Sequence, residues 1–459
     1  MVTGTYQLNV SMGQEEAVTR LRTYKLERCV TLVHDRSALN HAPVTDGDLI
    51  AIFEALSELQ ELQKLKVDFV GRPLRLPVSA LTVVLQRASK LTQLVLEEVR
   101  LAGNVDELEA LASALRAHPS LQIVDLHGCV PAEGSEGTLD PLVTALAHVK
   151  TLTEVLLRNT RIASRHPVDN NNNLHPHNHL NLIPNNLHQL NINGGNAAAA
   201  VAAIQNNNNN NGGGGDDDSS SSDDDSDDEE ASTAPWNGSS LCALCQSPSL
   251  RVLTLRDMSE IRDQHLELMA DSLRSNDSLR ELTVCSIHLG ERAGRAMGQV
   301  LQVNRRLQKL EIQLHSGEHA IPITEVLQVN SSLKRLDLFF NGCISPRIRE
   351  AFTQMLRCNY RLLDLNGSVW RGQSNSEIDF YLRLNRAGRG DLLTEHATRA
   401  HWVDTMIEQR DDLSIVFSLL LMNPSVCLHD TTEFKDVNSP PGGAHGTSLH
   451  LRKKRKGQQ

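Results

Sequence analysis

The chain has 459 residues and a formal net charge of −11, of which the segment from Asp216 to Glu230 supplies eight aspartates and two glutamates. The remainder is nearly neutral, which argues against a nucleic-acid partner, because that would need sustained positive charge. The eight cysteines lack the paired spacing of a disulfide framework, and no apolar run approaches the ~18 residues of a membrane span. We therefore expect a soluble protein of a reducing, intracellular compartment with no membrane partner.

Residues 1–60 show no regular leucine spacing, although the segment from Cys29 to Val33 has strand character. Apolar residues at helical spacing follow it, namely Leu49, Phe53, Leu56 and Leu59. A stack of repeats needs its first apolar face covered. We predict that residues 1–60 form an N-terminal cap.

Residues 61–163 and 239–370 contain one leucine pattern that recurs every 26 to 31 residues. Each unit opens with a leucine, as at Leu250, and has apolar residues at the third and fifth positions beyond it, such as Leu253 and Leu255. The other openings are Leu62, Leu91, Leu121, Leu152, Leu279, Leu307, Leu333 and Leu362. The alternation predicts a short strand, and the apolar residues at helical spacing that follow predict a helix. Four units carry an asparagine three residues before the next opening, at Asn276, Asn304, Asn330 and Asn359. We interpret these asparagines as helix stops, because asparagine tolerates the left-handed conformation.

Stacked strand–helix units place their strands side by side in a parallel sheet, which curves inward because a helix is wider than a strand. The predicted fold is an α/β solenoid, a horseshoe with the sheet on its concave face and helices on its convex face. The units resemble the leucine-rich repeats of the ribonuclease-inhibitor-like subfamily. That family has asparagine or cysteine at the ninth position of each unit, and here only Cys129 and Asn341 match.

Residues 164–238 are rich in Asn, His, Gly, Asp and Ser, which predicts a mostly disordered insertion. Within it, the segment from Leu187 to Ile192 reproduces a repeat opening, and Ala197 to Ile204 has helical character. We predict one further unit near 187–204, split by the tract from Asn206 to Gly238. The alternative is two separate solenoids joined by a linker.

Residues 371–430 lose the period and are predicted to form a helical C-terminal cap, with helices at 374–384, 396–409 and 413–422. Its large apolar residues are Tyr381, Leu384, Trp402, Met406, Phe417 and Leu420. The stretch from Phe380 to Arg389 followed by Trp402 resembles a cap in uncharacterised repeat proteins of unicellular algae.

Residues 431–459 are predicted to be a disordered tail that ends in five consecutive basic residues, Arg452, Lys453, Lys454, Arg455 and Lys456. Such a cluster is typical of a nuclear import signal, and the alternative is a solvated charged end. We expect the protein in the cytoplasm, with the nucleus as the second location that this cluster suggests.

Candidate sites of chemistry are sparse. Cys242 and Cys245 have the spacing of half a zinc site or a redox pair, but no second pair follows. A histidine-rich patch could hold a transition metal, and it consists of His175, His177, His179 and His188. Gly388-Arg389-Gly390 lacks the pattern of a phosphate-binding loop, and no hydrolase signature occurs. We predict no metal, no cofactor and no catalytic residue, and hence no enzyme.

The side chains expected on the concave face are mixed in charge, which suits a protein partner. The predicted partner-binding residues are Arg256, Glu281, Lys309, Glu311, Arg335, Asp337 and Phe339. Phe339 is expected to be an interface anchor, or else to be covered by the C-terminal cap with Trp370 beside it.

The favoured function is a non-catalytic scaffold for protein–protein interaction. The first alternative is a GTPase-activating protein of the Ran type acting on a small GTPase, because such proteins have similar repeats and an acidic tract. Their acidic tract follows the repeats, however, and Arg158-Asn159-Thr160 is only a faint counterpart of their Asp-Asn-Ala-Phe-Gly loop. Ribonuclease inhibition is a third possibility, from fold analogy alone.

Overall fold

In the computed structural model, the described residues are 6–23, 28–34, 44–69, 74–132, 138–162, 238–286, 289–340, 344–367 and 376–427. Within these ranges, eleven strands form one sheet in the order β1-β2-β3-β5-β7-β9-β10-β11-β12-β13-β14, and every neighbouring pair is parallel. The strands are β1 Tyr6–Asn9, β2 Cys29–Val33, β3 Lys64–Asp68, β5 Gln93–Glu97, β7 Ile123–His127, β9 Glu154–Arg158, β10 Val252–Arg256, β11 Glu281–Cys285, β12 Lys309–Leu314, β13 Arg335–Phe340 and β14 Asp364–Asn366. A second, three-stranded sheet contains β4 Arg75–Pro77, β6 Arg100–Ala102 and β8 Val130–Pro131.

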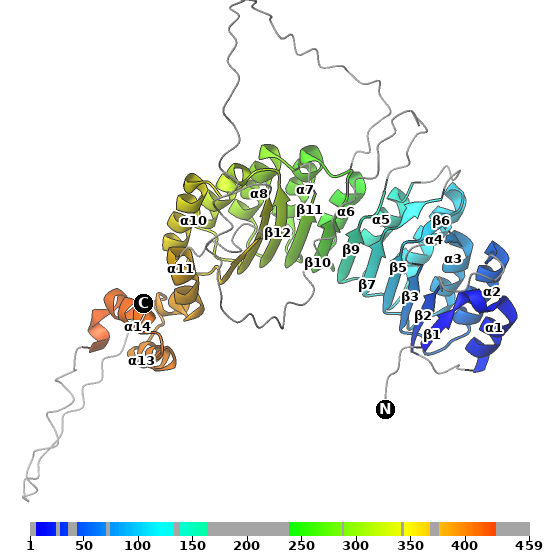
Figure 1. The fold of residues 1–459 in the computed structure, drawn as a ribbon, viewed down its shortest axis with the longest axis horizontal. Coiled ribbons are helices and arrows are strands. Elements are labelled where there is room, and N and C mark those ends of the chain that lie inside the picture. The colour runs from blue at the N-terminus through cyan, green and yellow to red at the C-terminus, as the bar shows by residue number, and fades with distance from the viewer. Residues whose placement is uncertain are drawn as a thin grey trace, which may run out of the picture. The chain divides into compact units, whose positions relative to one another are not determined.

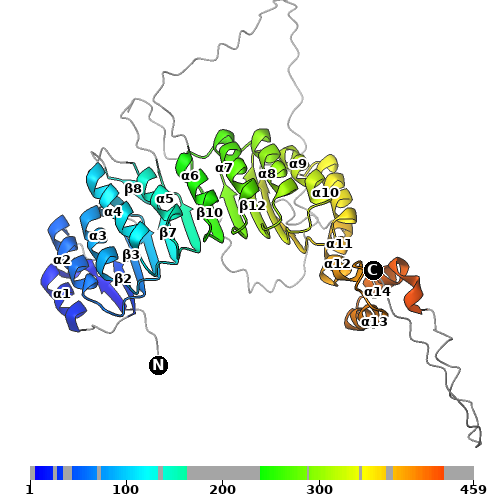
Figure 2. The ribbon, with the colours of Figure 1, turned by 180° about the vertical axis from the view of Figure 1, so that it is seen from behind.

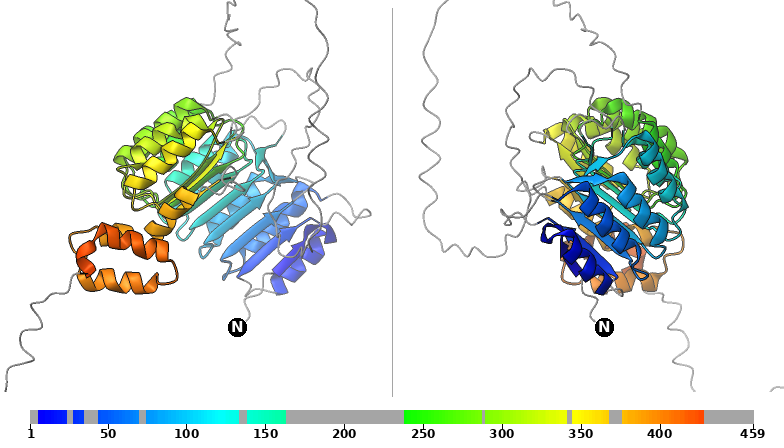
Figure 3. Two further views of the ribbon diagram at one scale, coloured as in Figure 1. Left: turned by 60° about the vertical axis from the view of Figure 1, so that its left-hand side comes forward. Right: turned by 90° about the vertical axis from the view of Figure 1, so that its right-hand side faces the viewer.

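Helices follow the strands and lie along one side of the large sheet (Figures 1 and 2). They are α1 Gln14–Thr23, α2 Asp46–Ser57, α3 Val78–Arg87, α4 Val105–Ala117, α5 Asp140–Ala147, α6 Ser239–Gln246, α7 Asp263–Ser275, α8 Glu291–Val303, α9 Ile321–Leu327 and α10 Pro346–Cys358. Each helix packs on the next one in the series, so the molecule is built by repetition of one contact (Figure 3). The short 3-10 helices are η1 Val10–Met12, η2 Gly317–Ala320 and η3 Pro424–Cys427.

The core consists of columns of aliphatic side chains between the sheet and the helices. The second and fourth strand positions, such as Leu253 and Leu255 of β10, are fully buried, and so is the opening Leu250. The register aligns Leu253 with Leu282 of β11, so equivalent residues of successive units stack on one another. The predicted repeat openings therefore supply the core that holds neighbouring units together.

The asparagines at the ends of the helices do not adopt the left-handed conformation that we predicted from the sequence. Asn276, Asn304 and Asn359 have extended backbones with φ of −72°, −68° and −89°. The side-chain amide of Asn304 donates to the carbonyl of Leu273 at 2.7 Å, and its oxygen accepts from the backbone N–H of Leu307 at 2.9 Å. Asparagine suits this bridging position, since an amide both donates and accepts.

The same bridge recurs from unit to unit. Asn276 donates to the carbonyl of Cys245, Asn330 to that of Leu301, and Asn359 to that of Asn330. Asn385, beyond the last regular unit, donates to the carbonyls of Asn359 and Leu362, both at 2.9 Å. These residues form a ladder of side-chain amides, hereafter the asparagine ladder, in which Asn276 is half-buried and the others are buried. The ladder links successive units between helices α6 and α11.

The sheet runs directly across the position of the insertion. Glu154 of β9 pairs with Val252 of β10, and Arg158 pairs with Arg256. Strands β9 and β10 are therefore direct neighbours, whereas the repeat opening predicted near 187–204 lies outside the described residues. The chain therefore leaves one unit after Ile162 and returns to it at Gly238.

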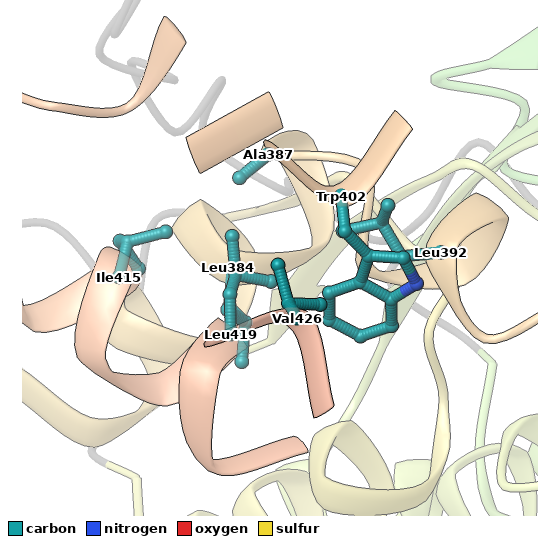
Figure 4. Close-up of a cluster of buried hydrophobic side chains, with 7 residues drawn as sticks. All are labelled: Leu384, Ala387, Leu392, Trp402, Ile415, Leu419 and Val426. Atoms are coloured by element: carbon teal, nitrogen blue, oxygen red, sulfur yellow. The ribbon is translucent and has the colours of Figure 1, made fainter. Parts of the chain in front are cut away.

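The C-terminal helices are α11 Ser376–Arg386, α12 Arg389–Leu392, α13 Arg399–Glu408 and α14 Leu413–Met422. Helix α11 packs on α10, and α14 packs on α11 and α13. A small core fixes them, formed by Leu384, Ala387, Leu392, Trp402, Ile415, Leu419 and Val426 (Figure 4). Phe417, one of the large apolar residues of the predicted cap, is exposed. No helix within the described ranges is long and apolar enough to span a membrane.

Candidate functional site

The face of the large sheet away from the helices, hereafter the open face, carries the first, third and fifth residues of each strand. The register aligns these residues in rows that run across the strands. The third-position row through the C-terminal half contains Thr254, Thr283, Glu311, Asp337 and Asn366, and the fifth-position row contains Arg256, Cys285, Gln313 and Phe339. The structure thus brings all seven predicted partner-binding residues onto one face of β10 to β13.

Glu311 lies at the centre of this region and is only 8% exposed. A buried carboxylate is costly unless it is paired and hydrogen-bonded. Arg256 reaches from β10 past β11 to bind it, and the hydroxyl of Thr283 and the thiol of Cys285 lie 3.5 and 3.7 Å from its oxygens. Burial, together with the charge of Glu311, raises the pKa of the Cys285 thiol to about 12.

Asp337, the neighbour of Glu311 in the third-position row, is 4% exposed and has its own partners. The guanidinium of Arg335 donates to it at 2.9 Å, and the side-chain amide of Asn366 donates to it at 2.8 Å. From the sequence we predicted that Glu311 and Asp337 would face a partner. The structure instead buries them beneath Arg256 and Arg335, whose charged ends remain accessible. Strand alternation predicted which side of the sheet each residue lies on, but not how exposed its side chain is. Exposure also depends on how far the arginines of neighbouring strands reach across it.

The other predicted residues surround these two pairs. Phe339 is half-buried at the end of β13 and aligns with Gln313 of β12. Lys309 lies 3.6 Å from Glu281 of the preceding strand. Trp370, the expected neighbour of Phe339, lies outside the described residues. Of the seven predicted residues, the accessible ones are therefore two arginines, one lysine–glutamate pair and part of one aromatic ring.

The N-terminal half of the open face is held in the same way. The ammonium of Lys66 lies 3.0 Å from Asp68 on its own strand and 2.8 Å from Glu97 on the next. Arg158 of β9 binds Asp125 of β7. Such cross-strand pairs fix long side chains that would otherwise be mobile, so the face presents a polar surface in one defined arrangement.

The residues that follow the strands also form hydrogen bonds between neighbouring units. Glu98, Asn159 and Asp257 have positive φ of 52°, 48° and 56°, and each donates its N–H to the last residue of the next strand. Thr160, at the ninth position of its unit, donates its hydroxyl to the carbonyl of Leu126 at 2.8 Å. Cys129 donates its thiol to the carbonyl of Leu96 at 3.4 Å. Thr160 therefore makes the same kind of bond to the preceding unit as Cys129 does, although a threonine at this position departs from the predicted pattern.

The remaining candidate sites have structural roles where they are described. Cys245 is fully buried, and burial raises the pKa of its thiol well above the usual range. Arg389, between the two glycines, is buried with its guanidinium 4.2 Å from the centre of the Tyr360 ring, and it donates to the carbonyl of Arg357 at 2.7 Å. In the part of the chain that the structure describes, no cluster of His, Cys, Asp or Glu could hold a metal ion. The histidine-rich patch and Arg452 to Lys456 lie outside that part.

The repeated strand–helix unit, the stacked leucines and the asparagine ladder together decide the architecture. The fold is leucine-rich-repeat-like. No family model matches the chain, and no curated protein matches its sequence.

Three solved structures align with parts of this leucine-rich-repeat-like chain. The actin-binding site 2 of leiomodin-1 covers 33% of this chain and 82% of its own at 17% identity, with a TM-score of 0.27. The tropomodulin C-terminal domain from Caenorhabditis elegans covers 34% and 97% at 11% identity, with a TM-score of 0.30. A chain of the yeast Rad7–Elc1 complex covers 81% and 72% at 13% identity, with a TM-score of 0.36. Scores this low give no information on partner or activity, so the site is interpreted from its own geometry.

Proposed function

We propose that the protein is a non-catalytic interaction scaffold that binds a protein partner. In this proposal the repeats form a horseshoe like that of the ribonuclease-inhibitor subfamily, and the open face of the sheet is its concave recognition surface. The observation that supports it most is the pair of arginines held over buried carboxylates on β10 to β13, beside half-buried Phe339.

This arrangement suits protein recognition for two physical reasons. Arg256 and Arg335 are fixed by Glu311 and Asp337, so little side-chain freedom is lost when a partner contacts them. Phe339 offers apolar area within a polar surround, which is the composition of an interface anchor and its rim. Arginine and aromatic residues are also those that carry most binding energy in interfaces.

The test compares proteins captured from an extract of the source cells by the wild type, by Phe339→Ala and by a control, Arg292→Ala. Arg292 lies on helix α8, away from the open face, and its side chain is exposed. A partner bound by the wild type and the control should bind the Phe339→Ala variant at least tenfold more weakly, since anchors contribute about 2 kcal/mol or more. The melting temperature should change little. Equal binding by all three proteins would overturn the site, and a lowered melting temperature would instead indicate a contact with the cap.

The Ran-type GTPase-activating protein remains the alternative function. The segment Arg158-Asn159-Thr160, its one sequence counterpart, is engaged in the fold: Arg158 binds Asp125, and Thr160 is buried and bonded to Leu126. These contacts support the scaffold, because an activating loop needs residues free to reach the nucleotide. Purified protein should leave the hydrolysis rate of a panel of small GTPases unchanged, and a stimulated rate would favour the alternative.

A further inference from the structure

Helix α14, Leu413–Met422, presents an apolar stripe to solvent. Its sequence contains no charged residue, and only Ile415 and Leu419 are buried, in the small core of Figure 4. Leu413, Phe417 and Leu421 are 77%, 62% and 64% exposed. Their spacing of four residues places them on one line along the helix, hereafter the α14 stripe. Apolar residues gathered in this way mark an interaction surface more often than single exposed ones do.

The polar groups beside the stripe are already satisfied within the helix. The hydroxyl of Ser414 donates to Asp412 at 2.6 Å, and that of Ser418 donates to the carbonyl of Ser414 at 2.8 Å. Both side chains are small, so another helix can approach closely without burying an unpaired hydroxyl. The surface next to the stripe is therefore suited to helix packing.

We propose that the α14 stripe is a contact between two copies of this chain, with the two α14 helices antiparallel across a twofold axis. The stripe reads the same in both directions, because a leucine lies four residues on either side of Phe417. Under such an axis Phe417 meets its counterpart, and Leu413 meets Leu421 of the other copy. A twofold interface requires this kind of self-complementary surface.

Charge also favours the antiparallel arrangement. Helix α14 carries no charge of its own, and the nearest acidic groups, Asp411 and Asp412, precede its first residue. Asp412 is paired with Arg383 of helix α11, so the carboxylate to consider is that of Asp411. An antiparallel pair keeps the two Asp411 side chains at opposite ends of a contact roughly 15 Å long, whereas a parallel pair would bring them together. Each helix N-terminus then lies near the other C-terminus, where the helix dipoles attract. An unrelated partner helix with charges on its contact face would find no counter-charge on α14.

The size of the contact sets its strength. Three large side chains from each copy bury less than the ~1,200 Å² at which stable interfaces begin. We therefore expect a weak dimer that forms at micromolar or higher concentration. The inference is independent of the proposed function, because α14 does not belong to the open face.

Sedimentation velocity of the full-length protein from about 2 to 200 μM tests self-association. The wild type should shift from monomer to dimer over this range, and Phe417→Ser should weaken the association at least tenfold. The matched control is Val329→Ser, which removes a 70% exposed apolar side chain after helix α9. A wild type that stays monomeric throughout overturns the proposal, whether the tail, a lipid surface or another protein covers the stripe. Equal weakening by Val329→Ser also overturns it.

Cysteine cross-linking tests the geometry in a background in which Cys343, Cys358 and Cys427 are serine. The Phe417→Cys variant should form disulfide-linked dimers with itself. A mixture of Leu413→Cys and Leu421→Cys should cross-link faster than either variant alone, because the antiparallel helix pair places position 413 against position 421. Faster linking of each variant with itself would contradict the antiparallel arrangement. Circular dichroism melting of every variant confirms that the comparison is made between folded proteins.

Discussion

At the scale of single residues, stacking depends on buried amides as much as on leucines. Leucine burial is non-directional, so it brings units together without fixing how they are aligned. The asparagine ladder adds directional bonds between the end of one unit and the start of the next. Asn304, for example, ends the unit that Leu279 opens, and it bonds to Leu273 of the preceding unit and to Leu307 at the opening of the following unit. Each rung therefore fixes the spacing of two units.

Asn304→Ala should lower the free energy of unfolding by roughly 2 to 4 kcal/mol, because it leaves buried carbonyl and N–H groups without partners. The control is Gln302→Ala, which removes an amide from an exposed position of helix α8. Urea unfolding followed by circular dichroism measures both. A loss in Asn304→Ala no larger than that in Gln302→Ala would mean that the ladder is dispensable.

His118 occupies the corresponding place in one N-terminal unit, three residues before Leu121, and it should make stability depend on pH. Its ring nitrogen lies 3.2 Å from the carbonyl of Ala88, and burial lowers its pKa below the ordinary value of 6.5. When the folded-state pKa of a histidine is lowered, the unfolded chain binds the proton first as the pH falls. The stability that neutral His118 contributes is therefore fully present above pH 6.5, and it is lost as the pH falls below that value.

The measurement is urea unfolding at pH 7.5 and at pH 5.5 for the wild type, His118→Asn and a control, His148→Asn. His148 is exposed at the end of helix α5. His118→Asn should lose less stability between the two pH values than the wild type, while His148→Asn should behave like the wild type. The same loss in all three proteins would assign the pH dependence to other groups.

The sequence predicted the leucine columns and the parallel strand–helix order because both follow from local spacing. It also predicted that Phe339 and Arg335 share a face, since strand alternation is local too. The burial of Glu311 could not be predicted, because it depends on Arg256 reaching over from two strands away. The exposure of Phe417 could not be predicted either, because a helix with no charged residue and only two serines gives little indication of which face packs.

At the scale of elements, the shortest unit requires a close contact between helices. From Leu307 to Leu333 the spacing is 26 residues, and the helical part of this unit consists of η2 and the short helix α9. The neighbouring helix α8 approaches this segment through Gly294 and Gly298. A Cβ atom on Gly294 would lie 1.9 Å from the carbonyl oxygen of His319. The short unit therefore packs this closely because α8 has glycine at the two positions that face the backbone of His319 and Pro322.

Gly294→Ala should lower the free energy of unfolding by about 1 to 3 kcal/mol, since backbone must move to admit the methyl group. The control is Gly47→Ala in helix α2, where the nearest atom to an added Cβ is 3.7 Å away. There alanine should leave stability unchanged or raise it by up to ~1 kcal/mol, because alanine favours helices over glycine. Thermal unfolding of the two variants in parallel separates the stability lost through a packing clash from the stability gained through helix propensity. Stabilisation by Gly294→Ala would show that the contact can relax.

At the scale of the whole molecule, the direct pairing of β9 with β10 predicts that the insertion is not needed for the stack. Replacing residues 163–237 by a short Gly-Ser linker should preserve a single cooperative unfolding transition and change its midpoint little. The reason is that loop closure costs only about 0.6 kcal/mol for each doubling of loop length. Differential scanning calorimetry of the full-length and shortened proteins provides the comparison. Two separate transitions after the replacement would indicate that the insertion holds two halves together.

We also propose that Arg452 to Lys456 directs the protein to the nucleus, because the cluster is dense in positive charge. Replacing all five basic residues by serine should shift a fluorescent fusion from the nucleus to the cytoplasm. Replacing Arg305 and Arg306, a basic pair between helix α8 and strand β12, serves as the control and should leave the distribution unchanged. An unaltered distribution in the tail variant would contradict the proposal.

The direct pairing of β9 and β10 also determines where the length of this sequence can vary. Runs of asparagine and aspartate codons lengthen and shorten by slippage during replication, and elsewhere in the repeats such a change would break the register of every following strand. Here the strands on either side pair with each other, so the register does not depend on the intervening length. Alleles that differ by many residues between 163 and 237 should therefore fold alike. Natural length polymorphism should be concentrated in this one segment.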